Sequence, residues 1–237
     1  MNPKNFEIPD CETCSVKNHS IFAVLQKDDL HEISFNKGCS FYKRGQAIFQ
    51  EGSRPIGAFC INSGKVKVSK IGDEGREQIV RLSKKGDVVG YRALISGENY
   101  TASATALDDC VICQIPKSIF HEILRKNPEL SLKVMQLLSH DLKESEKKMA
   151  DLVQKPVRER LAQALLMLAE IYGYENDNKT LDVILSREDV ANIAGTATET
   201  IIRLLSDFNK EKLIALTGKK IQLLDKNKLV RTANVFD

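Results

Sequence analysis

Glu199 and Arg203 are four residues apart and carry side chains that can recognise base pairs. An arginine can donate two parallel hydrogen bonds to O6 and N7 of guanine, and a carboxylate can accept one from the amino group of cytosine. Residues four apart in a helix share a face, so one exposed face would present both side chains. The alternative is an ordinary surface ion pair between them. The flanking sequence decides between these two interpretations.

That flanking sequence, Leu185–Leu213, predicts two short helices joined at Gly195. Ser186 and Asp189 can cap the first helix, and Gly195 can adopt positive φ and end it. In the second helix, apolar residues follow the i, i+3, i+4, i+7 spacing of a buried face: Ile201, Leu204, Leu205 and Phe208. Two helices joined through a glycine turn are typical of a helix-turn-helix, whose second helix enters the major groove of DNA. The pattern therefore favours base recognition.

The polar face of the second helix and a following hairpin supply the other expected contacts. Two β-prone runs in Leu213–Leu224 flank a Thr-Gly-Lys-Lys turn, which predicts a hairpin and hence a winged helix-turn-helix. The two lysines of this turn can contact phosphate groups, or they can simply be exposed to solvent. A capping box between Thr196 and Glu199 would occupy the carboxylate that base recognition needs. We expect base contacts from Thr198, Glu199, Ile202 and Arg203, and phosphate contacts from Arg187, Thr200, Ser206, Lys219 and Lys220.

Composition limits the classes of function. The chain has 237 residues, 42% of them hydrophobic, and a formal net charge of +3, so a buried core is expected but charge alone does not indicate nucleic-acid binding. No apolar run reaches the length of a membrane span, and the N-terminus lacks the apolar region of a signal peptide. We therefore expect a cytoplasmic protein without a membrane partner. No Ser-His-Asp, HExxH or phosphate-loop pattern is present, so an enzyme is not expected.

The chain has six cysteines, two of which form a CxxC motif, Cys11 and Cys14. Disulfides are improbable in a cytosolic protein, so metal binding and redox chemistry are the alternatives. Cys60 and Cys110 alternate with apolar neighbours, and we interpret both as small buried residues.

Glycines and helical stripes predict the remaining organisation. Ten of the thirteen glycines fall between Gly38 and Gly97, among short β-prone runs, which predicts an antiparallel β-roll of the cupin-like or jelly-roll type. A long apolar stripe predicts a helix over Glu129–Val153, interpreted as a dimerisation helix rather than one packed only within its own chain. The expected fold class is α+β. The expected segments are 1–20 (cysteine-containing segment), 21–127 (β-roll sensor), 128–154 (dimerisation helix) and 155–237 (winged helix-turn-helix).

With these elements in order, the chain resembles the Crp/Fnr family of bacterial transcription regulators over essentially its whole length. Three stretches carry the match: Lys85–Gly97, Asp108–Phe120 and Leu185–Phe208. The resemblance implies that Glu199 and Arg203 read the TGA-like core of each half-site. Family members with the Fnr half-site have serine just before the arginine. Ile202 stands there in this chain and can instead contact a thymine methyl group.

The resemblance also bears on cyclic nucleotides. Family members that bind cyclic AMP have Gly-Glu in the first phosphate loop and Arg-Ser in the following strand. The matching positions here are Gly90-Tyr91 and Tyr100-Thr101, so the arginine that a phosphate needs is missing. We expect no cyclic AMP binding. Arg92 lies nearby and is interpreted as a solvated side chain rather than an anion ligand.

Fnr-type oxygen sensors in this family hold a [4Fe–4S] cluster with an N-terminal CxxC, a third cysteine soon after it and a fourth in a β-roll strand. Cys11, Cys14 and Cys113 match three of these positions, and Ser20 stands at the remaining one. Three interpretations stay open: a cluster whose fourth ligand is Ser20, His19 or Cys39; another metal or a thiol switch at the CxxC; or a motif without a ligand.

The leading hypothesis is a homodimeric transcription regulator that binds a palindrome in double-stranded DNA and responds to redox state or oxygen. It would contact RNA polymerase if it activates transcription. The second hypothesis is a ligand-sensing β-roll whose winged helix binds another protein rather than a specific DNA site.

Overall fold

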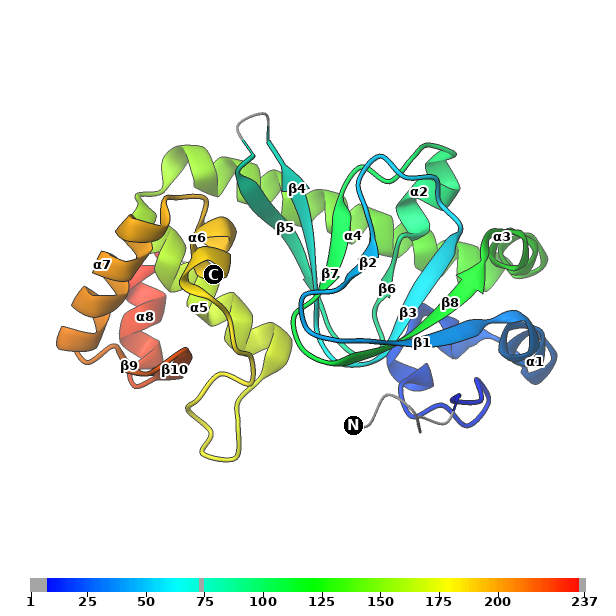
Figure 1. The fold of residues 1–237 in the computed structure, drawn as a ribbon, viewed down its shortest axis with the longest axis horizontal. Helices are drawn as coiled ribbons and strands as arrows, with labels where there is room; N and C mark the ends of the chain where they lie inside the picture. The colour runs from blue at the N-terminus through cyan, green and yellow to red at the C-terminus, as the bar shows by residue number, and fades with distance from the viewer. Residues whose placement is uncertain (1–7, 73–74, 235–237) are drawn as a thin grey trace. The chain divides into compact units, whose positions relative to one another are not determined.

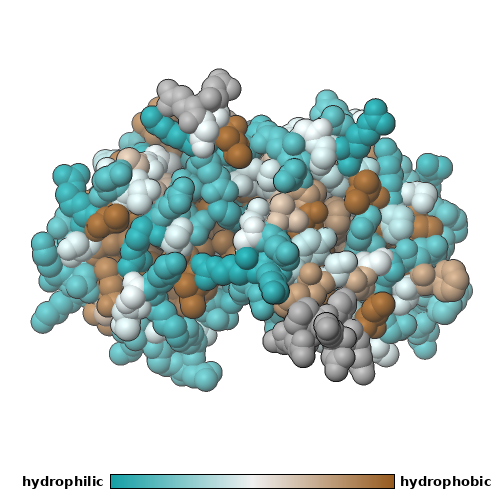
Figure 2. Space-filling view, viewed as in Figure 1, coloured by the Kyte–Doolittle hydropathy of each residue, from teal (hydrophilic) through white to brown (hydrophobic). Residues whose placement is uncertain are grey.

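The computed structural model describes residues 8–72 and 75–234, which form two compact units (Figure 1). One unit contains the described residues up to Ile71 together with Arg81–Glu144. The other contains Gly72–Val80 and the described residues from Ser145 onward. On the face drawn in Figure 2, apolar side chains form small separated groups among hydrophilic ones, as is normal for a solvated surface.

Two four-stranded sheets form the β-roll. One has the strand order β1-β8-β3-β6 and the other β2-β7-β4-β5. The strands are β1 (Gly38–Tyr42), β2 (Ala47–Phe49), β3 (Gly57–Ser63), β4 (Val66–Ile71), β5 (Glu77–Ser83), β6 (Val88–Val89), β7 (Ser103–Ala106) and β8 (Cys110–Pro116). The register pairs of β1, β2, β3 and β4 with their neighbours β6, β7 and β8 are antiparallel. The glycine-rich stretch predicted this arrangement, and the antiparallel roll is confirmed.

Alternation along the strands gives the first sheet two different apolar faces. Phe59 and Ile61 of β3 belong to the cluster between the two sheets. Ala58 of the same strand and Ile115 of β8 belong to a second cluster on the opposite face. Consecutive residues of a strand point to opposite faces, so both faces of this sheet are buried.

Gly64 allows the close turn between β3 and β4. Its φ is +92°, and a Cβ there would lie 2.5 Å from the Sγ of Cys110. A side chain at this position is therefore excluded both by the backbone conformation and by the thiol.

Helices and the N-terminal segment cover the face of the first sheet that carries Ala58 and Ile115. The helices are the 3-10 helices η1 (Lys17–His19) and η2 (Ile21–Val24), and the α-helices α1 (Lys27–Asn36), α2 (Tyr91–Ser96) and α3 (Lys117–Lys126). Phe22, Leu30, Ile33, Phe120 and Ile123 pack there with Ala58 and Ile115. The N-terminal segment is therefore held by apolar packing against the sheet.

The long helix α4 spans Pro128–Gln154, as the apolar stripe predicted. Its first residue is proline, whose missing N–H group is not needed at a helix start. Leu130 and Val134 are buried in the core of the first unit. Thus the first part of the stripe packs within the chain, while Met135, Leu142 and Met149 are exposed by 57%, 60% and 60%.

The second unit contains a helix-turn-helix and a hairpin. Its elements are α5 (Val157–Tyr172), α6 (Arg187–Ala194), α7 (Thr198–Lys210), β9 (Ile214–Thr217), β10 (Lys220–Leu223) and α8 (Lys226–Thr232). Leu161, Leu165, Val190, Ile201 and Phe208 are fully buried and form part of its core. The winged helix-turn-helix and the α+β class are confirmed. In the described part of the chain, no helix is both long and apolar enough to cross a membrane.

Candidate functional site

The turn between α6 and α7 has the predicted local chemistry. The Ser186 hydroxyl accepts a hydrogen bond from the Asp189 backbone N–H at 2.9 Å, and the Asp189 carboxylate accepts one from the Ser186 N–H at 3.0 Å. This capping box fixes the start of α6. Gly195 ends α6 with φ of +67°. A left-handed residue at this position lets the chain reverse into the second helix.

Arg160 holds this turn, and the sequence analysis did not identify it. Its guanidinium donates hydrogen bonds to the carbonyl oxygens of Ala194 at 2.9 Å and Gly195 at 3.1 Å. It also donates to the carbonyl of Lys155 at 2.7 Å. One charged side chain therefore joins the start of α5 to the end of α6 through charge-assisted bonds. Its contacts are all to backbone atoms, so no sequence pattern marks it.

The exposed face of α7 is the candidate DNA-reading surface. Glu199, Ile202, Arg203 and Ser206 are exposed, whereas Ile201, Leu205 and Phe208 are buried beneath them. Leu204, expected on the apolar face, is half-buried. Apart from Leu204, α7 has the buried apolar face and the exposed polar face that the sequence predicted.

Glu199 and Arg203 do not form the surface ion pair that was the alternative. Neither side chain has a hydrogen bond or an ion pair with any residue that the structure describes. The N-cap residue of α7 is Ala197, with no side-chain cap, so the Thr196–Glu199 capping box is absent as well. The Glu199 carboxylate and the Arg203 guanidinium therefore have their hydrogen-bonding groups available to a ligand.

The start of α7 also presents backbone donors. The first N–H groups of a helix have no carbonyl partner inside it, and here no side chain caps them. They carry a partial positive charge that favours an anion such as phosphate. Thr198 and Thr200, both half-buried, lie in this first turn.

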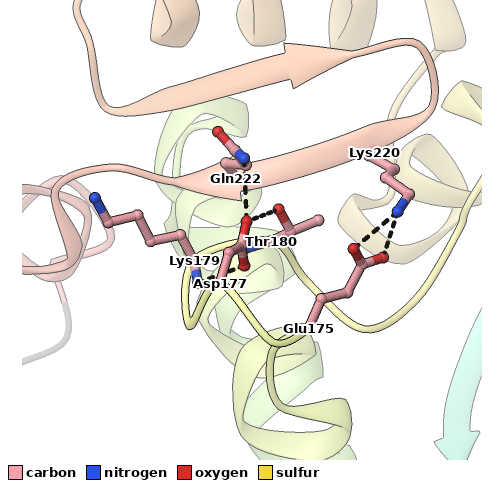
Figure 3. Close-up of polar contacts among 6 residues, drawn as sticks. All are labelled: Glu175, Asp177, Lys179, Thr180, Lys220 and Gln222. Atoms are coloured by element: carbon pink, nitrogen blue, oxygen red, sulfur yellow. Dashed lines mark hydrogen bonds and ion pairs between the residues drawn. The ribbon is translucent and has the colours of Figure 1, made fainter.

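The wing is an antiparallel pair, β9 with β10, turning at Gly218 and Lys219. Figure 3 shows how the loop before α6 is tied to β10. Glu175 forms an ion pair with Lys220, with 2.8 Å between Oε1 and Nζ, and the Asp177 carboxylate accepts a hydrogen bond from the Gln222 amide at 3.2 Å. Lys219 at the tip is exposed. Of the two lysines expected at phosphates, Lys220 is thus already paired within the chain.

Asp177 is the centre of that loop. Its carboxylate accepts hydrogen bonds from the Thr180 hydroxyl at 2.5 Å and from the backbone N–H groups of Thr180 and Lys179 at 2.8 and 3.0 Å. These bonds, led by that of the Thr180 hydroxyl, lower the pKa of Asp177 to about 2. Arg187, another expected phosphate contact, donates to the Gly218 carbonyl at 2.9 Å and so supports the wing turn.

The positions matched to a cyclic-nucleotide site are occupied by packed aromatic side chains. Tyr91 is buried, and its hydroxyl donates to Oδ2 of Asp141 at 2.8 Å, where Arg81 also donates at 2.6 Å. Burial raises the pKa of Tyr91 to about 12. The Tyr100 ring stacks on Phe49 at 4.1 Å between centroids. Arg92 is exposed, as expected of a solvated side chain.

Three cysteines form a row across the first sheet. Cys113 of β8 is the register partner of both Cys39 of β1 and Cys60 of β3. Directly opposed residues of antiparallel strands have side chains on the same face. Cys110 belongs to the cluster on the other face, between the sheets. The interpretation of Cys110 as a small buried residue is confirmed. Cys60 is partly buried and packs on the opposite face of the sheet, against the second cluster.

Cys60 lines the same cavity as Cys11, Cys14 and Cys113. The cavity lies between the N-terminal segment, α1 and the sheet, is partly open to solvent and has a volume of about 40 Å³. Burial, and then the charges of Cys14 and Cys11, raise the pKa of the Cys60 thiol to about 12. The hydrogen bond with Cys39, followed by burial, raises the pKa of Cys113. Four cysteines thus line one partly buried space.

Basic and polar side chains reach this cavity. Lys37 donates from Nζ to the Sγ of Cys11 at 2.9 Å, and Asn62 donates from Nδ2 to the Sγ of Cys14 at 3.3 Å. Burial raises the pKa of Cys11, an effect that Lys37 opposes. Within the described residues, no group of three His, Cys, Asp or Glu side chains is placed to hold a single metal ion.

None of the three candidate fourth ligands is well placed. The Ser20 hydroxyl borders the cavity, but it donates to the Lys17 carbonyl at 2.9 Å and accepts from the Phe22 N–H at 3.2 Å, where it caps η2. His19 is exposed and is not among the residues lining the cavity. Cys39 contacts Cys113 but also does not line the cavity.

Comparison with known proteins agrees with this architecture. A model described as cyclic nucleotide-binding domain matches residues 40–127, and one described as Crp-like helix-turn-helix domain matches residues 159–232. The fumarate and nitrate reduction regulatory protein of Vibrio cholerae is 30% identical, covering 95% of this chain and 90% of the relative. Electron transport regulator A of Shewanella oneidensis is 30% identical, covering 92% and 88%.

Solved structures share the fold. FixK2 from Bradyrhizobium japonicum superposes with a TM-score of 0.76 at 22% identity, covering 85% of this chain and 99% of that one. The CRP/FNR family regulator TTHA1359 from Thermus thermophilus has a TM-score of 0.71 at 26% identity, covering 84% and 99%.

Proposed function

The chain belongs to the Crp/Fnr family of transcription regulators, and from this premise we propose that it binds, as a homodimer, a DNA palindrome with TGA-like arms. The observation that carries the proposal is the exposed face of α7, on which Glu199 and Arg203 have no partner among the described residues. In an interior or a protein interface, two such charged groups would need partners. On a helix entering the major groove, base edges supply them.

Base recognition is divided among four side chains of α7. Arg203 donates to guanine, and Glu199 accepts from cytosine. Ile202, exposed by 53%, gives an apolar contact to a thymine methyl group, and Thr198, the first residue of the helix, gives a further base contact. Family members with serine at the position of Ile202 would read a different base there, so Ile202 would give this chain a different half-site.

Phosphate contacts come from the start of α7 and the wing. Thr200 and Ser206 flank the reading face, and Lys219 is exposed at the wing tip. Lys220 and Arg187 hold the wing through Glu175 and the Gly218 carbonyl, so we assign them to positioning the wing before any contact with phosphate. Such contacts fix the register of the protein on DNA without reading its sequence.

Dimerisation is assigned to α4. Met135, Leu142 and Met149 are exposed and seven residues apart, which is the repeat of a two-stranded coiled coil. A second copy of the same helix would cover them. Two recognition helices can occupy one palindrome only if its half-sites are about one helical turn apart.

The signal is assigned to a [4Fe–4S] cluster held by Cys11, Cys14 and Cys113. Support comes from the thiols that face one cavity and from relatives named as regulators of fumarate and nitrate reduction and of electron transport. When bound, the cluster supplies a redox- and oxygen-sensitive centre. The chain's thiolates would bind it, and Lys37 and Asn62 would donate hydrogen bonds to the sulfur atoms, which tune the potential of such centres.

The compartment and the protein partner are proposed from the family. The chain would act in the cytoplasm and contact RNA polymerase where it activates transcription. Catalysis is no part of the proposed function.

The test is the ratio of affinities for a TGA-type palindrome and for the same DNA with both arms scrambled. At one fixed salt concentration near the physiological value, a specific regulator should bind the palindrome at least about 10³-fold more tightly. DNA with one intact arm is the matched control and should bind weakly. Equal affinity for all three DNAs would contradict the proposal and favour a winged helix that binds another protein.

A further inference from the structure

We propose that Cys60 is the fourth thiolate, with Cys11, Cys14 and Cys113, of the site that holds the iron–sulfur cluster. The inference rests on the cluster assigned under the proposed function, and it replaces Ser20, His19 and Cys39 as candidates for that ligand. The resemblance to Fnr-type sensors puts the remaining cysteine at Ser20, where this chain has no thiol.

The sheet register places Cys60 beside a ligand already assigned. Cys60 and Cys113 are direct register partners on β3 and β8, so their side chains leave the same face of the sheet at neighbouring positions. The same face carries Ala58 and Ile115, against which the N-terminal segment packs. Cys60 therefore points toward the segment that contains the CxxC motif.

The cavity brings the four thiols together. Cys11 and Cys14 border it from the N-terminal segment, and Cys60 and Cys113 border it from the sheet. The charges of Cys11 and Cys14 both act on the pKa of Cys60, as expected for sulfur atoms around one space. No hydrogen bond joins the Cys60 thiol to any residue in the described ranges, so its sulfur is available to bind a ligand.

The rival ligands are less well placed than Cys60. The Ser20 hydroxyl is used in both directions by the backbone of η1 and η2. Cys39 lies on the opposite side of Cys113 from Cys60, since the strand order is β1-β8-β3. An iron–sulfur cluster is held by four thiolates in preference to oxygen or nitrogen ligands, so the remaining cavity cysteine is the best match.

In the part of the chain that the structure describes, the lack of a closely gathered set of three ligand side chains favours a cluster over a single ion. A tetrahedral zinc ion draws its sulfur ligands to about 2.3 Å from one point. No three ligand side chains among residues 8–72 and 75–234 are that closely gathered. A [4Fe–4S] cluster places each thiolate on a different iron atom at the corners of a larger body, so its ligands stand farther apart.

The experiment measures iron and acid-labile sulfide per chain in protein purified without oxygen, together with its visible absorption. The wild type is compared with Cys60→Ala, Ser20→Ala and Cys39→Ala. We expect about four iron and four sulfide per chain in the wild type and in Ser20→Ala and Cys39→Ala. In Cys60→Ala, both contents should fall at least about fourfold, with loss of the visible absorption.

A second variant separates ligand loss from misfolding. Cys60→Ser has nearly the same volume, and its far-ultraviolet circular dichroism and oligomeric state should equal those of the wild type, while its iron and sulfide still fall at least about twofold. Full iron and sulfide in both Cys60 variants, with a loss in Ser20→Ala or Cys39→Ala, would overturn the role of Cys60 and leave the cluster in place. A wild type without iron and sulfide, or with iron and no sulfide, would overturn both the cluster and this inference.

Discussion

At the scale of single residues, Glu199 and Arg203 differ from most charged pairs four apart on a helix. Opposite charges at this spacing usually stabilise the helix slightly by pairing. Here both are exposed, and neither has a partner among the described residues. Neither side chain is therefore engaged within the described part of the chain, and both are available for the proposed contacts to DNA.

Arg203→Ala should weaken binding to the palindrome by about 1–3 kcal/mol and flatten discrimination at the contacted base pair. The reason is the loss of a bidentate contact to guanine. Binding to scrambled DNA should change much less, because nonspecific affinity comes mainly from phosphates. Fluorescence anisotropy with matched DNAs measures both. Arg231→Ala, an exposed arginine of α8, is the control and should leave the ratio unchanged. A wild-type ratio in Arg203→Ala would remove this residue from the reading face.

Asp177 gives a pH-dependent prediction. Its pKa is lowered from 3.8 to about 2, chiefly by the Thr180 hydroxyl, so the folded state favours the charged carboxylate. A depressed pKa contributes stability that is complete above the unfolded value and is lost as pH falls through the folded one. Asp177→Asn should therefore melt at a lower temperature than the wild type above about pH 4, and the gap should narrow toward about pH 2. Melting curves across this range test it; a gap that does not change with pH would show that the charge is irrelevant.

At the scale of elements, the reading helix depends on contacts behind it. Phe208 and Leu205 anchor α7 in the core of the unit, and Arg160 fixes the turn that precedes it. The wing has its own attachment through Glu175 and Lys220 (Figure 3). The reading helix and the wing are thus held by buried apolar side chains, by Arg160 and by the Glu175–Lys220 ion pair.

Arg160→Met keeps much of the apolar stem and removes the guanidinium. The carbonyls of Ala194 and Gly195 then lose their donors, and we expect a loss of about 1.5–3 kcal/mol in the free energy of unfolding. Chemical denaturation measures it. Lys210→Met is the matched control, because Lys210 is exposed and its ion pair with Asp207 spans 4.0 Å, so a change below about 1 kcal/mol is expected. Equal effects in the two variants would contradict the role of Arg160.

At the scale of the whole molecule, α4 packs within its own chain near its start and has exposed apolar residues farther along. Leu130 and Val134 are committed to the core of the first unit. Leu142, Met149 and Leu152 of the predicted stripe are exposed by 60%, 60% and 43% and are available to the proposed second copy. The interpretation of the stripe as a dimerisation surface therefore narrows to these positions.

Leu142→Glu should dissociate the proposed dimer, because it would bury a carboxylate against its own copy. Sedimentation should show a monomer at concentrations at which the wild type is dimeric, and affinity for the palindrome should fall toward that for one arm. Lys147→Glu, an exposed position outside the seven-residue repeat, is the control and should remain dimeric. A dimeric Leu142→Glu would place the interface elsewhere.

Local pattern accounts for much of what could be predicted. The capping box of Ser186 and Asp189, the turn at Gly195 and the stripe of Ile201, Leu205 and Phe208 depend on neighbours along the chain, and all three were predictable. Arg160 was not, since arginine donors to backbone carbonyls leave no pattern in sequence. The face of the sheet on which Cys60 lies was not predictable for a related reason. Alternation shows that a strand has two faces but not what covers each face.

The sequence by itself determined the order of the roll, the long helix and the winged helix-turn-helix, because turns, caps and apolar periods are local. It also determined which residues of α7 face outward. Only the tertiary structure decided that Cys60 and Cys113 are register partners and that the N-terminal CxxC lies over them. Strand register and the packing of a distant segment arise from contacts between residues far apart in the chain, and a single sequence does not encode them as a spacing.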